Sequence, residues 1–190
     1  MRTKVVTLIL TAVMVIMAGC GTKKGPDGST DYKTAEEFLN AVYSAYNENE
    51  KFPVAGGDSE NMVPDQAGTF NKELTEELDM VLGIPEEEAV YIEDVASMVH
   101  MMNGNIFTGA AIRLNEKTDI FSFSEHVKEN VLQRQWLCGS PERFLIIDAG
   151  NGCIVSAFGQ ADIVDTFKEK VSSVSEASEV LVEEEIVENY

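Results

Sequence analysis

Few side chains in this sequence could carry out covalent or metal chemistry: among 190 residues there are three cysteines and two histidines. No Cys-x-x-Cys pair is present, which argues against thioredoxin-like chemistry. A cysteine nucleophile would need a histidine beside it. His126 lies about 18 Å from Cys138 if one helix carries both, which is too far, whereas a pairing of His126 with Cys153 stays open. Because no hydrolase motif or phosphate-binding glycine-rich loop accompanies these residues, we expect no enzyme.

A second set of candidates is the methionine-rich stretch Met98, His100, Met101 and Met102. Methionine and histidine suit copper. On a β-strand, Met98, His100 and Met102 would share one face, and Met101 would lie on the other. Core methionines that fill irregular gaps explain the same residues, so we expect no metal and no other cofactor.

The N-terminal segment has the composition of a secretory signal. Arg2 and Lys4 give it a positive start, and residues 5–18 form an apolar run that only two threonines interrupt. Fourteen residues are too few to cross a bilayer, which takes about 20, but they suit a signal peptide. An uncleaved membrane anchor is therefore the weaker alternative.

The end of this segment, Ala18-Gly19-Cys20, resembles the lipobox of bacterial lipoproteins, with Met17 where that family prefers leucine. The resemblance implies cleavage before Cys20 and a diacylglyceryl thioether on its sulfur. Together with a further acyl chain such as palmitate, this would anchor the protein stably on the extracytoplasmic face of the cell membrane. The alternative is an ordinary signal peptide that is cut near Ala18.

An extracytoplasmic location also bears on the other two cysteines. It permits a disulfide between Cys138 and Cys153. The alternative is two free, buried thiols, because a disulfide requires Cα atoms within about 7 Å.

The formal net charge is −19, and loss of Arg2 and Lys4 on cleavage would make the chain still more negative. Nucleic acid and bare anionic lipid would be repelled, so we expect no nucleic-acid partner. Cations, basic proteins and basic peptides are better matched. A solvated acidic surface without any partner accounts for the same charge.

The pattern along the chain divides it into four parts: a signal peptide, 1–19; a flexible tether, 20–33; a single α+β domain, 34–174, with its core in 75–174 and an irregular loop at 49–72; and an acidic C-terminal tail, 175–190. The tail could form a strand, a helical turn or a mobile end. In the irregular loop, Asp58, Glu60 and Asp65 do not match the spacing of a calcium-binding loop.

Apolar periodicity predicts helices over 34–48, 73–82, 122–136 and 161–174, two of them opened by the capping boxes Thr34/Glu37 and Ser122/Glu125. Two hairpins are expected, 90–102 with 106–114 and 143–148 with 153–158, each joined by an Asn-Gly turn. A helix through 86–102 competes with the first hairpin. We expect a four-stranded antiparallel sheet in ββα–ββα order, with helices packed on one face and N-terminal helices before it.

The core pattern over about 75–172 resembles small Gram-positive lipoproteins of domain-of-unknown-function family 4358. The similar residues are Leu82-Gly83-Ile84, Tyr91, Ala110-Ala111-Ile112-Arg113-Leu114, Gln133-Arg134-Gln135 and Gly150-Asn151-Gly152. The polar insertion at 49–72 departs from that pattern. The resemblance implies a location and an architecture, but no activity and no binding residues.

The first functional hypothesis is a non-enzymatic, lipid-anchored module that binds a protein, a peptide or an envelope component. The second is a sensor or carrier for cations or small molecules that uses the carboxylates of 49–72. The third is a hydrolase without a recognisable motif.

Overall fold

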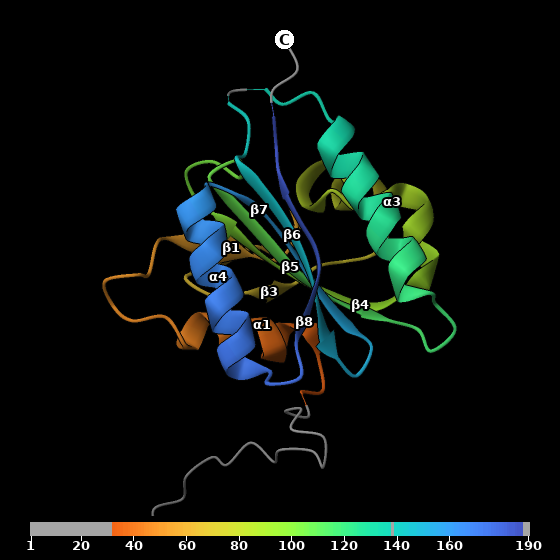
Figure 1. Cartoon of the computed structure of the whole chain (residues 1–190), viewed down its shortest axis with the longest axis horizontal. Helices are drawn as coiled ribbons and strands as arrows, with labels where there is room; N and C mark the ends of the chain where they lie inside the picture. Colours follow the sequence, from red (N-terminus) through yellow and green to blue (C-terminus); the bar gives the residue numbers. More distant parts are fainter. Residues whose placement is uncertain (1–31, 138, 188–190) are drawn as a thin grey trace, which may run out of the picture.

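The fold is built on one antiparallel sheet, seen in a computed structural model that describes residues 32–137 and 139–187. Its eight strands run in the order β2-β1-β4-β5-β7-β6-β8, and β3 also pairs with β4 (Figure 1). The strands are β1 Val54–Gly56, β2 Val63–Pro64, β3 Gly68–Thr69, β4 Ile92–His100, β5 Phe107–Leu114, β6 Arg143–Gly150, β7 Cys153–Gly159 and β8 Glu179–Glu185.

Helices cover both faces of this sheet. They are α1 Ala35–Ser44, α2 Thr75–Glu77, the π-helical turn η1 Leu78–Leu82, the 3-10 helix η2 Glu86–Tyr91, α3 Ile120–Gln133 and α4 Ala161–Val174. One hydrophobic core contains the apolar sides of α1 and α4, and the other contains those of η1 and α3. Figure 1 shows α4 and α3 on opposite sides of the strands.

The expectation that helices pack on one face is therefore wrong, and β6 shows why. Leu145 and Ile147 belong to the core with α1 and α4, whereas Phe144 and Ile146 belong to the core with η1 and α3. Successive side chains of a strand point to opposite faces, so an unbroken apolar run must be covered on both.

The expected four-stranded sheet is also wrong. The four expected strands exist as β4, β5, β6 and β7, but four more strands join them. Segment 49–72 contributes β1, β2 and β3, and the acidic tail contributes β8. The competing helix over 86–102 is limited to η2, because β4 begins at Ile92.

The two Asn-Gly turns behave differently. Asn151 and Gly152 both have positive φ, 55° and 71°, so the predicted type I′ turn between β6 and β7 is confirmed. Neither Asn103 nor Gly104 has positive φ, and β4 and β5 are joined by a six-residue loop. In that loop the Asn103 side chain accepts the N–H of Asn105, which turns the backbone by another route.

The helix starts were predicted in part. The Thr34 hydroxyl accepts the N–H of Glu37 at 3.1 Å and caps α1 as expected. The cap of α3 is Asp119, whose carboxylate accepts the N–H groups of Phe121 and Ser122. The predicted cap Ser122 is therefore inside the helix, while α4 has the predicted bounds.

Candidate functional site

A pocket of about 750 Å³ lies between the η1–η2 region and α3. Among the described residues that line it there is no lysine or arginine, and five are acidic. The lining residues are Thr75, Asp79, Pro85, Glu86, Glu87, Glu88, His126, Glu129, Asn130 and Gln133. The pocket is therefore an acidic depression in an already acidic protein.

The sequence of α3 explains how one helix serves both the core and this pocket. His126, Glu129, Asn130 and Gln133 recur at intervals of three and four, which places them on one helical face. An adjacent face carries Phe123, Val127 and Val131 into the hydrophobic core. Burial of that apolar face fixes the direction in which the polar face points.

The most unusual group in the pocket is Glu88, which is only 3% exposed. Its Oε1 lies 2.6 Å from Nδ1 of His126, whose side chain is 53% exposed. An ionised carboxylate can only accept a hydrogen bond, so Nδ1–H donates to an ionised Glu88. In that state Nε2 is the ring nitrogen left for a ligand or water.

Hydrogen bonds hold the neighbouring rim in place. Asp79 forms an ion pair with Arg134, with 2.7 Å between Nη2 and Oδ1. The Asn130 amide donates to the same Oδ1 at 2.8 Å and to the Gly83 carbonyl at 3.0 Å. Arg134 also lies over the Trp136 ring, 5.3 Å from its centroid. Asp79 is thus partly neutralised, whereas no ion pair to Glu87 or Glu129 occurs in residues 32–137 or 139–187.

The Glu88–His126 pair has the form of an oriented base, but it lacks a nucleophile. No hydroxyl or thiol of the described residues hydrogen-bonds to His126. The one hydroxyl in the lining, that of Thr75, donates to Glu86 at 3.1 Å. A pocket lined by several carboxylates, with no lysine or arginine among its described lining residues, is better suited to hold a positive charge than to stabilise an oxyanion.

The predicted cysteine sites lie elsewhere. Cys20 and Cys138 lie outside the described residues, so lipidation and the Cys138–Cys153 disulfide stay predictions. Cys153 forms no disulfide with another described residue, and it is buried in the core with α1 and α4, on the opposite face of the sheet from α3. It therefore cannot pair with His126 as a nucleophile. Burial raises the pKa of Cys153 to about 12, which keeps it a thiol.

The methionine-rich stretch does not converge on one point. Met98 is completely buried in the core, whereas Met102 is 84% exposed. The His100 ring stacks on Phe52, and its Nδ1 accepts the N–H of Met102 at 3.2 Å. Met98 is thus used in core packing, and His100 in ring stacking and in a turn.

The carboxylates of 49–72 are likewise not gathered around a cation. Asp58 is buried, and its two oxygens accept N–H groups of Glu60 and Asn61 at 2.9 Å and of Asn71 at 2.8 Å. Glu60 and Asp65 are exposed. In the described part of the chain, no group of three or more His, Cys, Asp or Glu side chains could hold a metal ion.

No family model, curated protein or solved structure matches this chain. The resemblance to the family 4358 lipoproteins therefore stays a prediction. None of the described helices has both the length and the apolar composition needed to span a membrane.

Sequence reasoning missed Glu88 as a site residue. It stands in an acidic run after Pro85, which is typical of a helix start, and 38 positions separate it from His126. A local signal could have found half of the site: His126, Glu129, Asn130 and Gln133 form a polar stripe on the predicted helix.

Proposed function

We propose that this protein is a non-enzymatic binding module that is lipid-anchored on the extracytoplasmic face of a cell membrane. Its partner is a protein or peptide that presents cationic side chains. The anchor rests on the sequence around Cys20. The choice of partner rests on the acidic pocket between η2 and α3.

The acidic pocket is the observation that carries the proposal. Glu87 and Glu129 line it without a described cation beside them, next to the fixed pair Glu88–His126. A lysine or arginine side chain that entered would meet several carboxylates at once. Ion pairs at a partly solvated site contribute less than about 1 kcal/mol each, so we expect moderate affinity that depends strongly on salt.

The absence of a nucleophile beside His126 in the described residues supports a binding role over hydrolysis. The second hypothesis, a cation carrier that uses segment 49–72, loses support because the Asp58 carboxylate is occupied by backbone N–H groups. Neutralising the buried Asp58 carboxylate would therefore lower the stability of the fold rather than the affinity for a cation.

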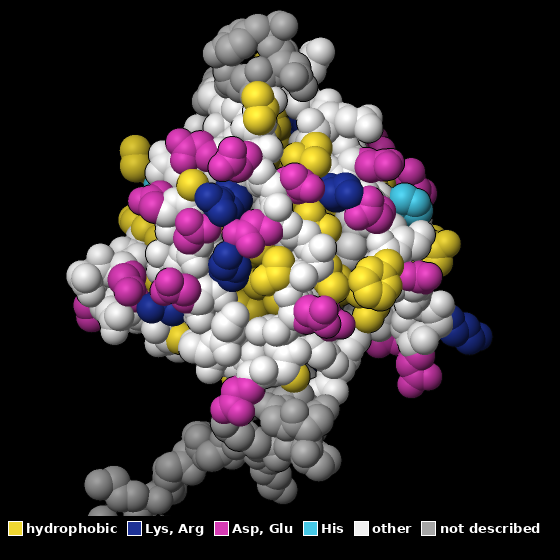
Figure 2. Space-filling model, in the orientation of Figure 1, with side chains coloured by type: hydrophobic (Ala, Val, Ile, Leu, Met, Phe, Trp, Pro, Cys, Tyr) yellow, Lys and Arg dark blue, Asp and Glu magenta, His cyan; other side chains and the backbone are white. Residues whose placement is uncertain are grey.

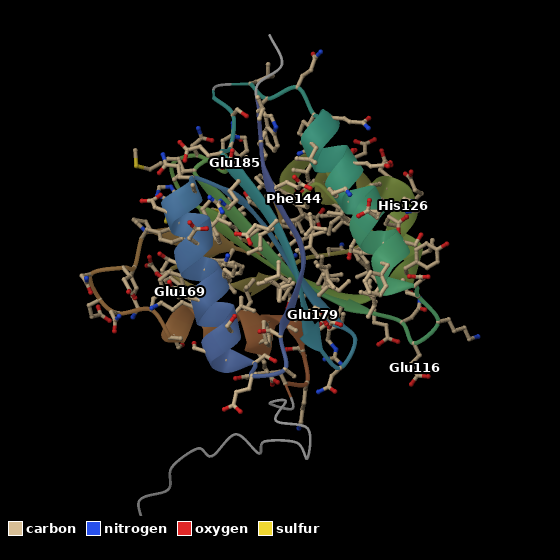
Figure 3. The ribbon with its side chains drawn as sticks, viewed as in Figure 1. Glu116, His126, Phe144, Glu169, Glu179 and Glu185 are labelled. Atoms are coloured by element: carbon tan, nitrogen blue, oxygen red, sulfur yellow. The ribbon has the colours of Figure 1, made fainter. Side chains whose placement is uncertain are left out.

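A charge-matched comparison tests the partner. The protein is the chain from residue 20 with Cys20→Ser to prevent lipidation. The ligand is a labelled eight-residue peptide of alternating lysine and threonine, and the fluorescence anisotropy of the peptide measures how much of it is bound. We expect Glu87→Gln/Glu129→Gln to weaken binding about tenfold, which is about 1.4 kcal/mol. The control Glu116→Gln/Glu169→Gln removes the same charge from two exposed positions that do not line the pocket (Figure 3).

Two results would count against the proposal. Equal loss of affinity in both double variants would mean that only the overall charge attracts the peptide. Turnover of a substrate that stops in His126→Ala would replace binding with catalysis. The anchor has its own test: wild-type chain in cells should sediment with membranes, and Cys20→Ser should release it.

A further inference from the structure

We propose that the outer edge of β8 binds an extended basic segment of the partner, which adds to the sheet as a further antiparallel strand. This inference rests on the proposed function, because it needs a cationic partner. It concerns a different surface from the acidic pocket, so each can fail separately.

The first argument is that β8 is a long open edge. Among the described strands β8 pairs with β6 alone, and it is seven residues long. At the other end of the sheet, β2 has two residues and one of them is Pro64, which cannot donate. Short strands, proline and bulges protect an edge from further pairing; β8 is neither short nor interrupted by proline, and the one register shift of its pairing, at residue 181, leaves 182–185 in regular register with β6. Figure 1 shows β8 in front, between α4 and α3.

The second argument is the direction of the backbone groups. The N–H of Ile186 donates to the Glu142 carbonyl at 2.9 Å, so residue 186 faces β6. Residues of an antiparallel strand alternate in the side to which they turn their N–H and C=O groups. Glu183 and Glu185 therefore turn their backbone N–H and C=O groups away from β6. An incoming strand would pair with these groups on the open side of β8.

The third argument is charge. Within the described structure, no cation lies within ion-pair distance of Glu179, Glu184 or Glu185. Glu183 differs, since Lys168 and Arg143 lie 2.7 Å and 3.0 Å from it, and these contacts, that of Lys168 above all, lower its pKa. On the face in Figure 2 acidic side chains are numerous around β8, with some basic and hydrophobic ones among them, and Figure 3 labels Glu179 and Glu185 near its two ends.

These observations select one occupant. A second copy of β8 would bring rows of glutamate together, and like charges on paired strands are destabilising. A segment with lysine or arginine at alternate positions would instead place cations beside the unpaired carboxylates. Strand addition gives affinity through main-chain hydrogen bonds and specificity through side chains.

The main test compares two peptides of equal charge. The first is the alternating lysine–threonine peptide, and the second is the same peptide N-methylated at its four central residues. Methylation removes N–H donors and adds bulk on both edges of a strand without changing the charge. We expect the methylated peptide to bind at least tenfold more weakly to the Cys20→Ser chain. Equal affinities would overturn strand addition.

Protein variants locate the contact. Glu184→Gln/Glu185→Gln should weaken the unmodified peptide, whereas Glu116→Gln/Glu169→Gln should not. A third outcome is that Glu87→Gln/Glu129→Gln is the one variant that loses binding and that methylation of the peptide has no effect. This outcome would support the proposed function and reject binding at the β8 edge. No binding of either peptide would reject both. Sedimentation could also show that the protein forms a dimer and that Glu184→Gln/Glu185→Gln strengthens it. In that case the β8 edge would be a contact between two copies of the chain, and the inference would be overturned.

Discussion

The carboxylate of Glu88, almost wholly removed from solvent, lies 2.6 Å from Nδ1 of the exposed side chain of His126. This contact joins η2 to α3 across the acidic pocket. A buried carboxylate needs a hydrogen-bond donor, so the two residues act as a unit in both stability and pocket shape.

We predict that His126→Ala lowers the free energy of unfolding by about 1–3 kcal/mol, because Glu88 is left buried without its donor. Glu88→Gln should cost less, because the amide oxygen can still accept from Nδ1. Urea denaturation measures both. The nearby exposed substitution Glu129→Gln is the control and should change stability by less than about 0.5 kcal/mol. If His126→Ala lowers the free energy of unfolding no more than Glu129→Gln does, water fully replaces the imidazole as the hydrogen-bond donor to Glu88.

Asp58→Asn should destabilise the region of β1 to β3 by about 1–3 kcal/mol, because the buried side chain keeps one acceptor oxygen where it had two and one N–H loses its acceptor. Burial alone would raise the pKa of Asp58, but hydrogen bonds from Asn71, Glu60 and Asn61 hold it below the ordinary value. The ionised carboxylate therefore stabilises the fold above pH about 4, the pKa of an unfolded Asp, and that contribution is lost as the pH falls further.

Denaturation at pH 7 and pH 3 checks the sign. The wild-type chain should lose more stability between the two values than Asp58→Asn does. Glu60→Gln, an exposed change in the same segment, should follow the wild-type curve. A pH profile of Asp58→Asn identical to that of the wild type would contradict the account.

Cys153 should not react with a thiol reagent in the folded protein, because burial raises its pKa to about 12 and leaves almost no thiolate. The test uses a chain with Cys20→Ser and Cys138→Ser, so that Cys153 is its one cysteine. We expect one thiol to react in denaturant and none without it. With Cys138 restored, absence of any reactive thiol in denaturant would demonstrate the predicted disulfide, and two reactive thiols would reject it.

Gly152→Ala should lower stability by about 1–2 kcal/mol, because its φ of 71° strains a residue with a Cβ. Gly104→Ala makes the same chemical change in the other Asn-Gly pair, where φ is not positive. The added Cβ would lie 3.3 Å from Oγ1 of Thr108 and 3.4 Å from Cγ1 of Val99, side-chain contacts that a small shift relieves, so this change should cost less. Thermal unfolding of the two variants measures the difference. An equal loss of stability in the two variants would show that the positive φ of Gly152 does not determine the loss.

The same comparison shows what could be predicted from the sequence. Asn-Gly signalled a hairpin in both places, yet only Asn151-Gly152 formed the tight turn. In the first hairpin the side chain of Asn103 supplies a local hydrogen bond that supports a longer loop. A dipeptide therefore indicates that the chain reverses direction, while the contacts around it decide the geometry.

The full width of the sheet was not predicted, because segment 49–72 reads as an irregular loop and the glutamates of the tail conceal a strand. In β8 the glutamates left a strand, a helical turn and a mobile end equally open, and Val182, buried against α3 and its neighbours, belongs to a strand. A strand at a sheet edge can be largely polar, since only part of it faces the core. The two-sided burial was foreseeable, because the apolar run in β6 leaves no solvent-facing positions.

The candidate site was less predictable than the fold. Its key contact joins Glu88 and His126, which 38 positions separate, and no local pattern links them. Conversely, the stretch from Met98 to Met102 looked chemically distinctive and is divided between core packing and an exposed turn.

Thermal unfolding of the Cys20→Ser chain, with and without the alternating lysine–threonine peptide, tests the central claim most directly. A ligand at 100 times its dissociation constant adds about 2.7 kcal/mol, which raises the midpoint by roughly 5–10 °C for a domain of this size. We predict that shift at low salt, a smaller one at high salt, and none with a peptide in which serine replaces lysine. An unchanged midpoint with saturating basic peptide would contradict the proposal that this acidic module binds a cationic partner.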